Sequence, residues 1–294
     1  MLCREEEVPL INKKRYLADL VLFIASMIWG IGYYFQKVAS ETTSWMTFNL
    51  MRYIIAALVL LCMAKFRFPP KGDGLKYTVL TGVLMFMGGN LQQLGLQTAS
   101  IGNASFITSI YIVLVPFSAA LLLHRRIKPA HYLAALISLA GLYLITTAGK
   151  GLERISAGDM IVFAGSIVWA LQILGVDKAV QYCDTIVFTA GEFLTAAVLQ
   201  LVVWLTIGHH DLTGAAVSWP YAAASGVVVL GLACAMQAFG QKHTGETEAS
   251  IIMGLESVFG ALFGVLLYHE QFAPVQGIGM LLIFAAVLIA VLKS

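Results

Sequence analysis

The chain has 294 residues, of which 59% are hydrophobic and only 12% charged, and its mean hydropathy is +0.84. Soluble domains average roughly 45–50% apolar and about 25% charged residues, so the composition excludes an ordinary soluble protein and indicates a membrane protein. The net charge of +2 comes from basic residues that are spread over polar joints rather than gathered on one face, and nucleic acid is not an expected partner.

Ten apolar segments follow one another, and each has the roughly 20 residues that a helix needs to cross a bilayer core of about 30 Å. Transmembrane strands would alternate polar and apolar residues in runs of about 10, and no such alternation is visible. The predicted fold class is an all-α integral membrane protein with ten transmembrane helices. We expect the helices at 17–37, 45–65, 75–97, 103–123, 129–148, 158–178, 184–207, 218–240, 247–268 and 274–292.

The N-terminal segment 1–16 is polar and has no cleavable signal, so the first apolar segment is expected to remain as a helix. With ten spans, fourteen lysines and arginines fall on the side of the N-terminus and three on the other side. Because basic residues concentrate on the cytoplasmic side of membrane proteins, both termini are expected to be cytoplasmic. The expected location is a bacterial-type plasma (inner) membrane.

The first and sixth segments contain related sequences. Residues 19–29 read DLVLFIASMIW and residues 159–169 read DMIVFAGSIVW, at a constant separation of 140. The same register continues into the next segment, where it sets Arg52 against Glu192, with the charge sign exchanged. The chain therefore contains an internal repeat.

The repeat predicts the organisation of the whole chain. Each copy holds five helices, an odd number, so the second copy must enter the membrane from the opposite side. Such inverted repeats are the plan of many secondary transporters, whose binding sites lie near the midplane between the halves. The predicted units are a cytoplasmic N-terminal segment 1–16, a first five-helix repeat 17–148, a linker 149–157 and a second five-helix repeat 158–294.

Three charged residues lie well away from the ends of predicted membrane helices, where a charge is rare and usually faces a polar interior or a functional path. Glu256 either pairs with another group, stays protonated or exchanges a proton during transport. A structural, snorkelling Arg52 remains the alternative to a functional one. The candidate coupling or gating residues are Glu256, Arg52 and Glu192.

Amides and aromatic side chains supply the candidate binding residues. Asn90 and Gln93 lie on one stripe of the third helix, and Gln237 is the counterpart of Gln93 in the second copy. Aromatic rings offer an apolar wall with a polar edge. Hydrogen bonding between helices and anchoring at the membrane interface are the alternative roles. The candidate substrate-binding residues are Trp29, Tyr33, Asn90, Gln93, Tyr111, Trp169, Gln237 and Glu256.

Several motifs resemble the EamA family of the drug/metabolite transporter superfamily. They include Trp29-Gly30 with Lys37, Arg52 before an apolar run, SFITSIYIVLVP at 105–116 and LESVFGALFGVLLYHEQF at 255–272. The resemblance covers both halves and implies ten helices in two related repeats. Members of this family move amino acids, nucleosides, sugars and drugs, mostly outward. Ser257 stands where the family often has proline, so no proline hinge is carried over to that position.

These observations predict a secondary active transporter that exports a small amphipathic organic metabolite, such as an amino acid or a related compound, by alternating access. The alternative is a non-transporting membrane receptor or scaffold on a transporter frame. The expected partners are a small-molecule substrate and the lipid bilayer, and both proton coupling and the choice between monomer and homodimer are left open.

Enzyme chemistry is not expected, because the sequence shows no Ser/His/Asp set, phosphate loop or zinc spacing. We therefore predict no catalytic residues, no metal and no cofactor. The one run that suggests a metal site is His209-His210-Asp211, which lies in a short joint without a third fixed ligand and is interpreted as solvated.

Overall fold

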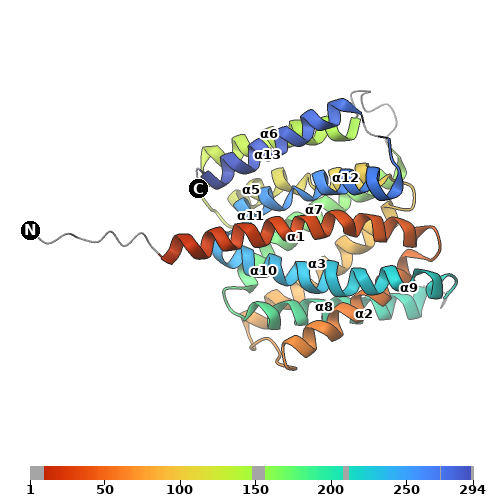
Figure 1. Cartoon of the computed structure of the whole chain (residues 1–294). Helices are drawn as coiled ribbons and strands as arrows, with labels where there is room; N and C mark the ends of the chain where they lie inside the picture. Colours follow the sequence, from red (N-terminus) through yellow and green to blue (C-terminus); the bar gives the residue numbers. More distant parts are fainter. Residues whose placement is uncertain (1–9, 148–155, 208–211, 272, 293–294) are drawn as a thin grey trace, which may run out of the picture.

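The computed structural model describes residues 10–147, 156–207, 212–271 and 273–292, and in these ranges the regular structure is entirely helical (Figure 1). His209-His210-Asp211 and most of the predicted linker lie outside the described residues. The helices of the first half are α1 (Leu10–Ser40), α2 (Trp45–Met63), α3 (Asp73–Gly95), α4 (Ile101–Thr108), α5 (Tyr111–Leu122) and α6 (Pro129–Thr147). Those of the second half are α7 (Ala157–Ala179), α8 (Thr185–Ile207), α9 (Ala215–Ala224), η1 (Ser225–Leu232), α10 (Ala233–Thr244), α11 (Glu246–Met253), α12 (Glu256–Tyr268) and α13 (Pro274–Leu292).

Eight spans of the described chain are long and apolar enough to cross a membrane, with α4–α5, α9–η1–α10 and α11–α12 each counted as one span. The two remaining helices, α3 and α6, also run along the bundle, which brings the described spans to ten (Figure 1). Large apolar side chains cover the outside: Leu121 is 73% exposed and Leu281 is 70% exposed. A surface of this kind is stable against lipid and costly in water. The chain is a multi-pass membrane protein.

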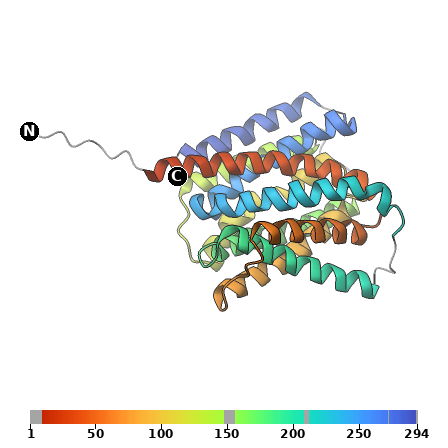
Figure 2. The same ribbon diagram turned by 60° about the horizontal axis from the view of Figure 1, so that its bottom comes forward.

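The helices pack against one another as one bundle. Helix α1 packs against α10 and α12, while α3 packs against α7 and α8. Helices α6 and α13 lie side by side along one edge in both ribbon views (Figures 1 and 2). Their backbones meet at Gly141, where an added Cβ would lie 2.6 Å from the carbonyl oxygen of Gly279. Small residues at this crossing allow the close approach on which helix packing in lipid depends.

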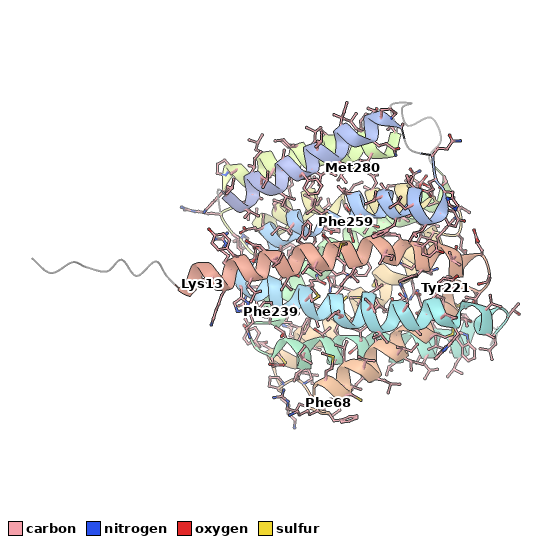
Figure 3. All side chains as sticks on the ribbon, in the orientation of Figure 1. Lys13, Phe68, Tyr221, Phe239, Phe259 and Met280 are labelled. Carbon is pink, nitrogen blue, oxygen red and sulfur yellow. The ribbon has the colours of Figure 1, made fainter. Side chains whose placement is uncertain are left out.

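We call the end of the bundle at which α1 begins and α13 ends the proximal end, and the other the distal end. Figure 3 shows Lys13 at the proximal end of α1 and Tyr221 of α9 toward the distal end. Successive spans alternate in direction between these two ends (Figure 1).

Two spans predicted as continuous helices, 103–123 and 247–268, are each broken near the middle. One break separates α4 from α5 at Ser109, and the other separates α11 from α12 at Gly254. A tighter turn is found at each break, because Ile112 N donates to Ser109 O at 3.0 Å and Ser257 N donates to Gly254 O at 3.2 Å. Such mid-helix turns release backbone groups from the regular ladder and often mark functional hinges.

The span predicted at 218–240 is also irregular, because η1 is a π-helix between α9 and α10. In its wider turn, the N–H of Ala233 reaches the carbonyl of Val228. Single π-turns are rare inside helices and occur frequently at functional sites. Here the turn reshapes the part of the span that faces α1 and α2.

The two copies of the repeat share local structure as well as sequence. Ser26 Oγ donates to the carbonyl of Phe23 at 2.7 Å, and Ser166 Oγ donates to the carbonyl of Phe163 at the same distance. Each serine lies three residues before a half-buried tryptophan on the same helix. The sequence match at a separation of 140 therefore corresponds to matching side-chain hydrogen bonds.

Candidate functional site

A partly open cavity lies inside the bundle, and the space between its protein atoms, including the part that is open to solvent, amounts to about 640 Å³. Its wall draws on spans from both halves of the chain. Seven of the residues that the sequence singled out lie along it: Trp29, Tyr33, Arg52, Tyr111, Trp169, Gln237 and Glu256. The wall also contains residues that were not predicted, among them Gln36, Tyr53, Gly89, Gln92, Thr108, Gln172 and Cys234.

Three predicted site residues do not line the cavity, because each is turned into the packing between helices. Asn90 donates to Gln200 Oε1 at 2.7 Å, and Gln93 donates to the backbone carbonyl of Gln36 at 3.0 Å. Glu192 accepts from Gln172 Nε2 at 2.8 Å. For the two amides, the structure shows the hydrogen bonding between helices that the sequence left as the alternative role.

Both tryptophans of the repeat reach the cavity with their indole N–H groups already bonded. Trp29 Nε1 donates to the carbonyl of Val229 in η1 at 3.2 Å, and Trp169 Nε1 donates to Gln92 Oε1 at 3.0 Å. An added Cβ on Gly88 would lie 3.0 Å from the Trp169 ring, so glycine lets α3 pack directly against the indole. With their polar edges satisfied, the rings offer apolar surface to a ligand.

The unpredicted amides form hydrogen bonds around the cavity. Gln92 Nε2 donates to Gln36 Oε1 at 3.3 Å, and Gln237 Nε2 donates to Gln172 Oε1 at 3.3 Å. Helical spacing could have indicated two of them, since Gln36 is seven residues after Trp29 and Gln172 is three residues after Trp169. These positions lie on the same helix faces as the tryptophans.

Glu256 is the first residue of α12, directly after the break, and it is 5% exposed. Ser109 Oγ, from the break in the other interrupted span, donates to Glu256 Oε1 at 3.4 Å. The hydroxyls of Tyr33 and Tyr111 lie within its electrostatic reach. No basic side chain forms an ion pair with Glu256 in the described ranges. The carboxyl group therefore has hydroxyl neighbours and no counter-charge.

Arg52 and Glu192, opposed in the sequence register, form no ion pair with each other. Arg52 Nε instead donates to Asn49 Oδ1 at 2.8 Å, and Asn49 Nδ2 donates to Asn90 Oδ1 at 2.6 Å. Because Asn90 continues to Gln200, these contacts join α2, α3 and α8. Arg52 and Glu192 are therefore two separate buried residues in the bundle and do not form one ion pair.

Ion pairs join the two halves of the chain at the proximal end of the bundle. Arg125, just after α5, binds Asp177 of α7 at 2.8 Å and also binds Glu246 at the start of α11. Arg15 of α1 binds Glu248 in the same region. Each of these contacts joins the first half of the chain to the second.

A different set of contacts joins the halves at the distal end. Glu270 accepts hydrogen bonds from Ile101 N at 2.9 Å and Gly102 N at 3.2 Å, at the N-terminus of α4. A carboxylate is favourable there because the first N–H groups of a helix have no partner within it. Glu41 also accepts a hydrogen bond from Tyr268.

No group of three or more histidine, cysteine, aspartate or glutamate residues that could hold a metal ion occurs among the residues whose placement is described. The cavity wall contains aromatic rings, amides, hydroxyls, the Cys234 thiol, the Arg52 guanidinium and the Glu256 carboxyl group. Apolar walls with a few polar groups are typical of sites that hold small molecules.

The model of the EamA-like transporter family matches residues 16–147 and 156–292, which is nearly the whole chain. The chain belongs to the EamA-like transporter family. This result confirms the family resemblance noted in the sequence, and it makes the protein a membrane transporter with a small-molecule substrate. The two matched ranges each hold five spans and together supply the wall of the cavity.

Curated relatives carry the same kind of name. An "Uncharacterized transporter" of Archaeoglobus fulgidus is 27% identical over 282 residues, covering 95% of this chain and 87% of the relative. Another "Uncharacterized transporter", from Methanothermobacter thermautotrophicus, is 22% identical and covers 66% of this chain and 58% of its own length. A crystal structure of a protein 19% identical to this chain has a TM-score of 0.77 and covers 95% of this chain and 98% of that one. This last likeness shows the fold alone.

Proposed function

We propose that this member of the EamA-like family is a secondary active transporter that exports a small amphipathic organic metabolite, such as an amino acid or a related compound. The observation that carries the proposal is one internal cavity with two indole rings, an acid and a guanidinium, drawn from both repeats. Apolar walls with a few placed polar groups are typical of small-molecule sites. The membrane in this proposal is a plasma (inner) membrane, with both termini on its cytoplasmic side.

Alternating access between two inverted repeats is the proposed mechanism. It is supported by the two helix breaks, which lie at equivalent positions of the two repeats, at α4–α5 in the first and at α11–α12 in the second. It is also supported by contacts that join the two halves at both ends of the bundle. In this mechanism the proximal contacts open toward the cytoplasm while the distal contacts stay closed, and the reverse state releases the substrate outside.

Glu256 is the proposed coupling group, acting as a proton carrier or as the partner of a substrate amine. An intramembrane acid without a counter-charge is the kind of residue that functions in proton relays of transporters. Its place at a helix break, beside Ser109 of the other interrupted span, would let a change in its charge bias both spans. Arg52 and Glu192 remain proposed gating residues.

Flux in proteoliposomes tests this function. Radiolabelled amino acids and other amphipathic metabolites are assayed one by one, with and without an imposed pH gradient. We expect Glu256→Gln to slow the flux about tenfold or more and to remove its response to the gradient, as expected for loss of a proton-transfer group. Asp73→Asn, an exposed change of the same kind at the start of α3, should behave like the wild type.

Two results would contradict the proposal. Unchanged rate and unchanged pH dependence in Glu256→Gln would exclude the coupling role of this residue. Binding of a metabolite without flux under several gradients would favour the receptor or scaffold alternative over the transporter.

A further inference from the structure

Arg52 is a buried cation in the cavity wall, and no described carboxylate forms an ion pair with it. Its side chain belongs to α2, and the residue is 3% exposed. The guanidinium carbon lies 5.4 Å from the centre of the Phe48 ring and 5.5 Å from that of Tyr53, while Nε donates to Asn49. The three ion pairs found among the described residues use Arg15 and Arg125, so no carboxylate pairs with Arg52 there.

The neighbours of Arg52 offset only part of the cost of burying its charge. A neutral amide and two aromatic faces stabilise a guanidinium, but a buried charge is normally compensated by an opposite charge. Arginine stays protonated in proteins, so the charge cannot be removed by losing a proton. The planar fork of N–H donors is matched to carboxylate and phosphate oxygens, which it binds in pairs.

A purely structural role does not account for this arrangement. The contacts that join α2 to α3 and α8 run through Asn49, Asn90 and Gln200, and they need no charged group. Arg52 lies at the end of this chain of hydrogen bonds, on the cavity side. An uncharged side chain at that position would leave the amide contacts between the helices in place.

The acid of the cavity does not neutralise Arg52. Glu256 lines the same cavity but is held beside Ser109, and the two charged groups form no ion pair. A cavity with one unpaired cation, one separate acid and two indole rings matches a ligand that has an anionic group and an apolar body.

We propose that Arg52 is the anion-binding subsite of the cavity and that the ligand is a small organic anion or zwitterion whose carboxylate or phosphate docks on the guanidinium. The apolar body of the ligand lies against Trp29 and Trp169. This inference deepens the proposed transport function and rests on it for the movement of the ligand after binding. It changes the role of Arg52 from a gate to a substrate contact.

The test uses the full-length chain in detergent and pairs of probes that share an apolar body. The pairs are indole-3-propionate with indole-3-propionamide, phenylalanine with phenylalaninamide, and phenyl phosphate with phenol. Dissociation constants come from the shift of the thermal unfolding midpoint with probe concentration. We expect an anionic probe to bind the wild type about tenfold or more tightly than the partner that lacks the anionic group, because the ion pair forms with a buried guanidinium.

In Arg52→Gln we expect this preference to fall to about twofold or less, since the anion loses its partner. Arg52→Lys should keep a preference for the anion with weaker binding, because the charge remains but the paired donors are lost. Arg126→Gln, at an exposed arginine after α5, should keep the wild-type preference. Equal binding of both members of every pair to the wild type, no binding by any anionic probe, or a preference that survives in Arg52→Gln would overturn the inference.

A second measurement needs no variant. Phenylglyoxal modifies accessible guanidinium groups, and mass spectrometry of the peptide that contains Arg52 reports its rate. The best anionic probe should slow this modification, and its amide partner should not; equal rates with both would contradict the subsite.

The binding and flux measurements distinguish failure of the subsite from failure of the transport function. Anion binding at Arg52 without any flux would contradict the transport function and leave the subsite standing. Equal flux of the uncharged and the anionic member of each pair would contradict the subsite and leave the transport function standing.

Discussion

Tyr111 and Glu256 each begin the second half of a broken membrane span, Tyr111 as the first residue of α5 and Glu256 as the first residue of α12. The two residues are equivalent in the repeat, because ASFITSIY at 104–111 aligns with ASIIMGLE at 249–256, here at a separation of 145. Both line the cavity. The same break in the backbone therefore presents a phenol from one repeat and a carboxyl group from the other. The two repeats share the position of the break and differ in the side chain that follows it.

Removing the Tyr111 hydroxyl should affect transport more than stability. This hydroxyl is buried in the cavity wall beside the Glu256 carboxyl, so Tyr111→Phe removes a polar contact of the cavity and none of the amide contacts that join the helices. We expect an unfolding midpoint close to that of the wild type and a several-fold lower flux, about 1 kcal/mol for a lost ligand hydrogen bond. Tyr143→Phe, which alters an exposed tyrosine on α6, is the matched control. A flux equal to that of the wild type would show that the hydroxyl takes no part in binding or transfer.

Truncating either cavity tryptophan should weaken binding of the anionic probes. A buried aromatic contact contributes about 0.5–1.5 kcal/mol beyond its area, so Trp29→Ala and Trp169→Ala should each raise the dissociation constant about tenfold. Trp219→Ala removes an indole that is 52% exposed on α9 and should leave binding unchanged. The readout is the probe-dependent shift of the unfolding midpoint. If both cavity variants bound as tightly as the wild type, the apolar wall would have to lie elsewhere.

Asn90 should matter for stability, although it does not line the cavity. Asn90→Leu removes the acceptor at 2.6 Å from Asn49 Nδ2, which keeps the carbonyl of Gly89 at 3.2 Å, and it removes the donor to Gln200 Oε1. A buried group that loses its hydrogen bond costs about 1–3 kcal/mol. We expect a lower thermal unfolding midpoint in detergent. Gln97→Leu, at an exposed amide just after α3, serves as the control. Equal midpoints for the two variants would show that the network is not stabilising.

Breaking the proximal ion pairs should open the cavity from that end. Arg125→Gln leaves Asp177 and Glu246 without their cation and weakens the tie between the two halves. We expect Cys234, a buried thiol in the cavity wall, to react faster with a membrane-impermeant thiol reagent added on the proximal side. Arg126→Gln, which alters the exposed neighbouring arginine, is the control.

The thiol experiment uses a chain in which Cys3, Cys62 and Cys183 are replaced by serine, so that Cys234 alone is labelled. Glu270→Gln provides the counterpart, because it weakens the cap on α4 at the distal end and should raise labelling from the distal side. Labelling rates that do not depend on the side of addition would argue against gates at the two ends.

The amino-acid sequence alone predicted the membrane class, the ten spans, the family and the equivalence of Trp29 with Trp169. These features follow from local rules. Lipid offers no hydrogen bonds to the backbone, so every long apolar segment must be helical, and the length of each segment is set by the thickness of the bilayer. The repeat register could be read directly, because both copies kept the residues around the two tryptophans.

Only the tertiary structure decided which polar side chains meet in the cavity. Gln92 lines the cavity and Gln93 does not, although the two are neighbours in the sequence. Successive residues of a helix point about 100° apart, so the rotation of α3 against α1 and α7 selects one amide and turns the other into the packing. That rotation depends on contacts between distant segments, such as Gly88 against Trp169. The same dependence on packing explains why Arg52 and Glu192, opposed in the repeat register, remain unpaired in the bundle.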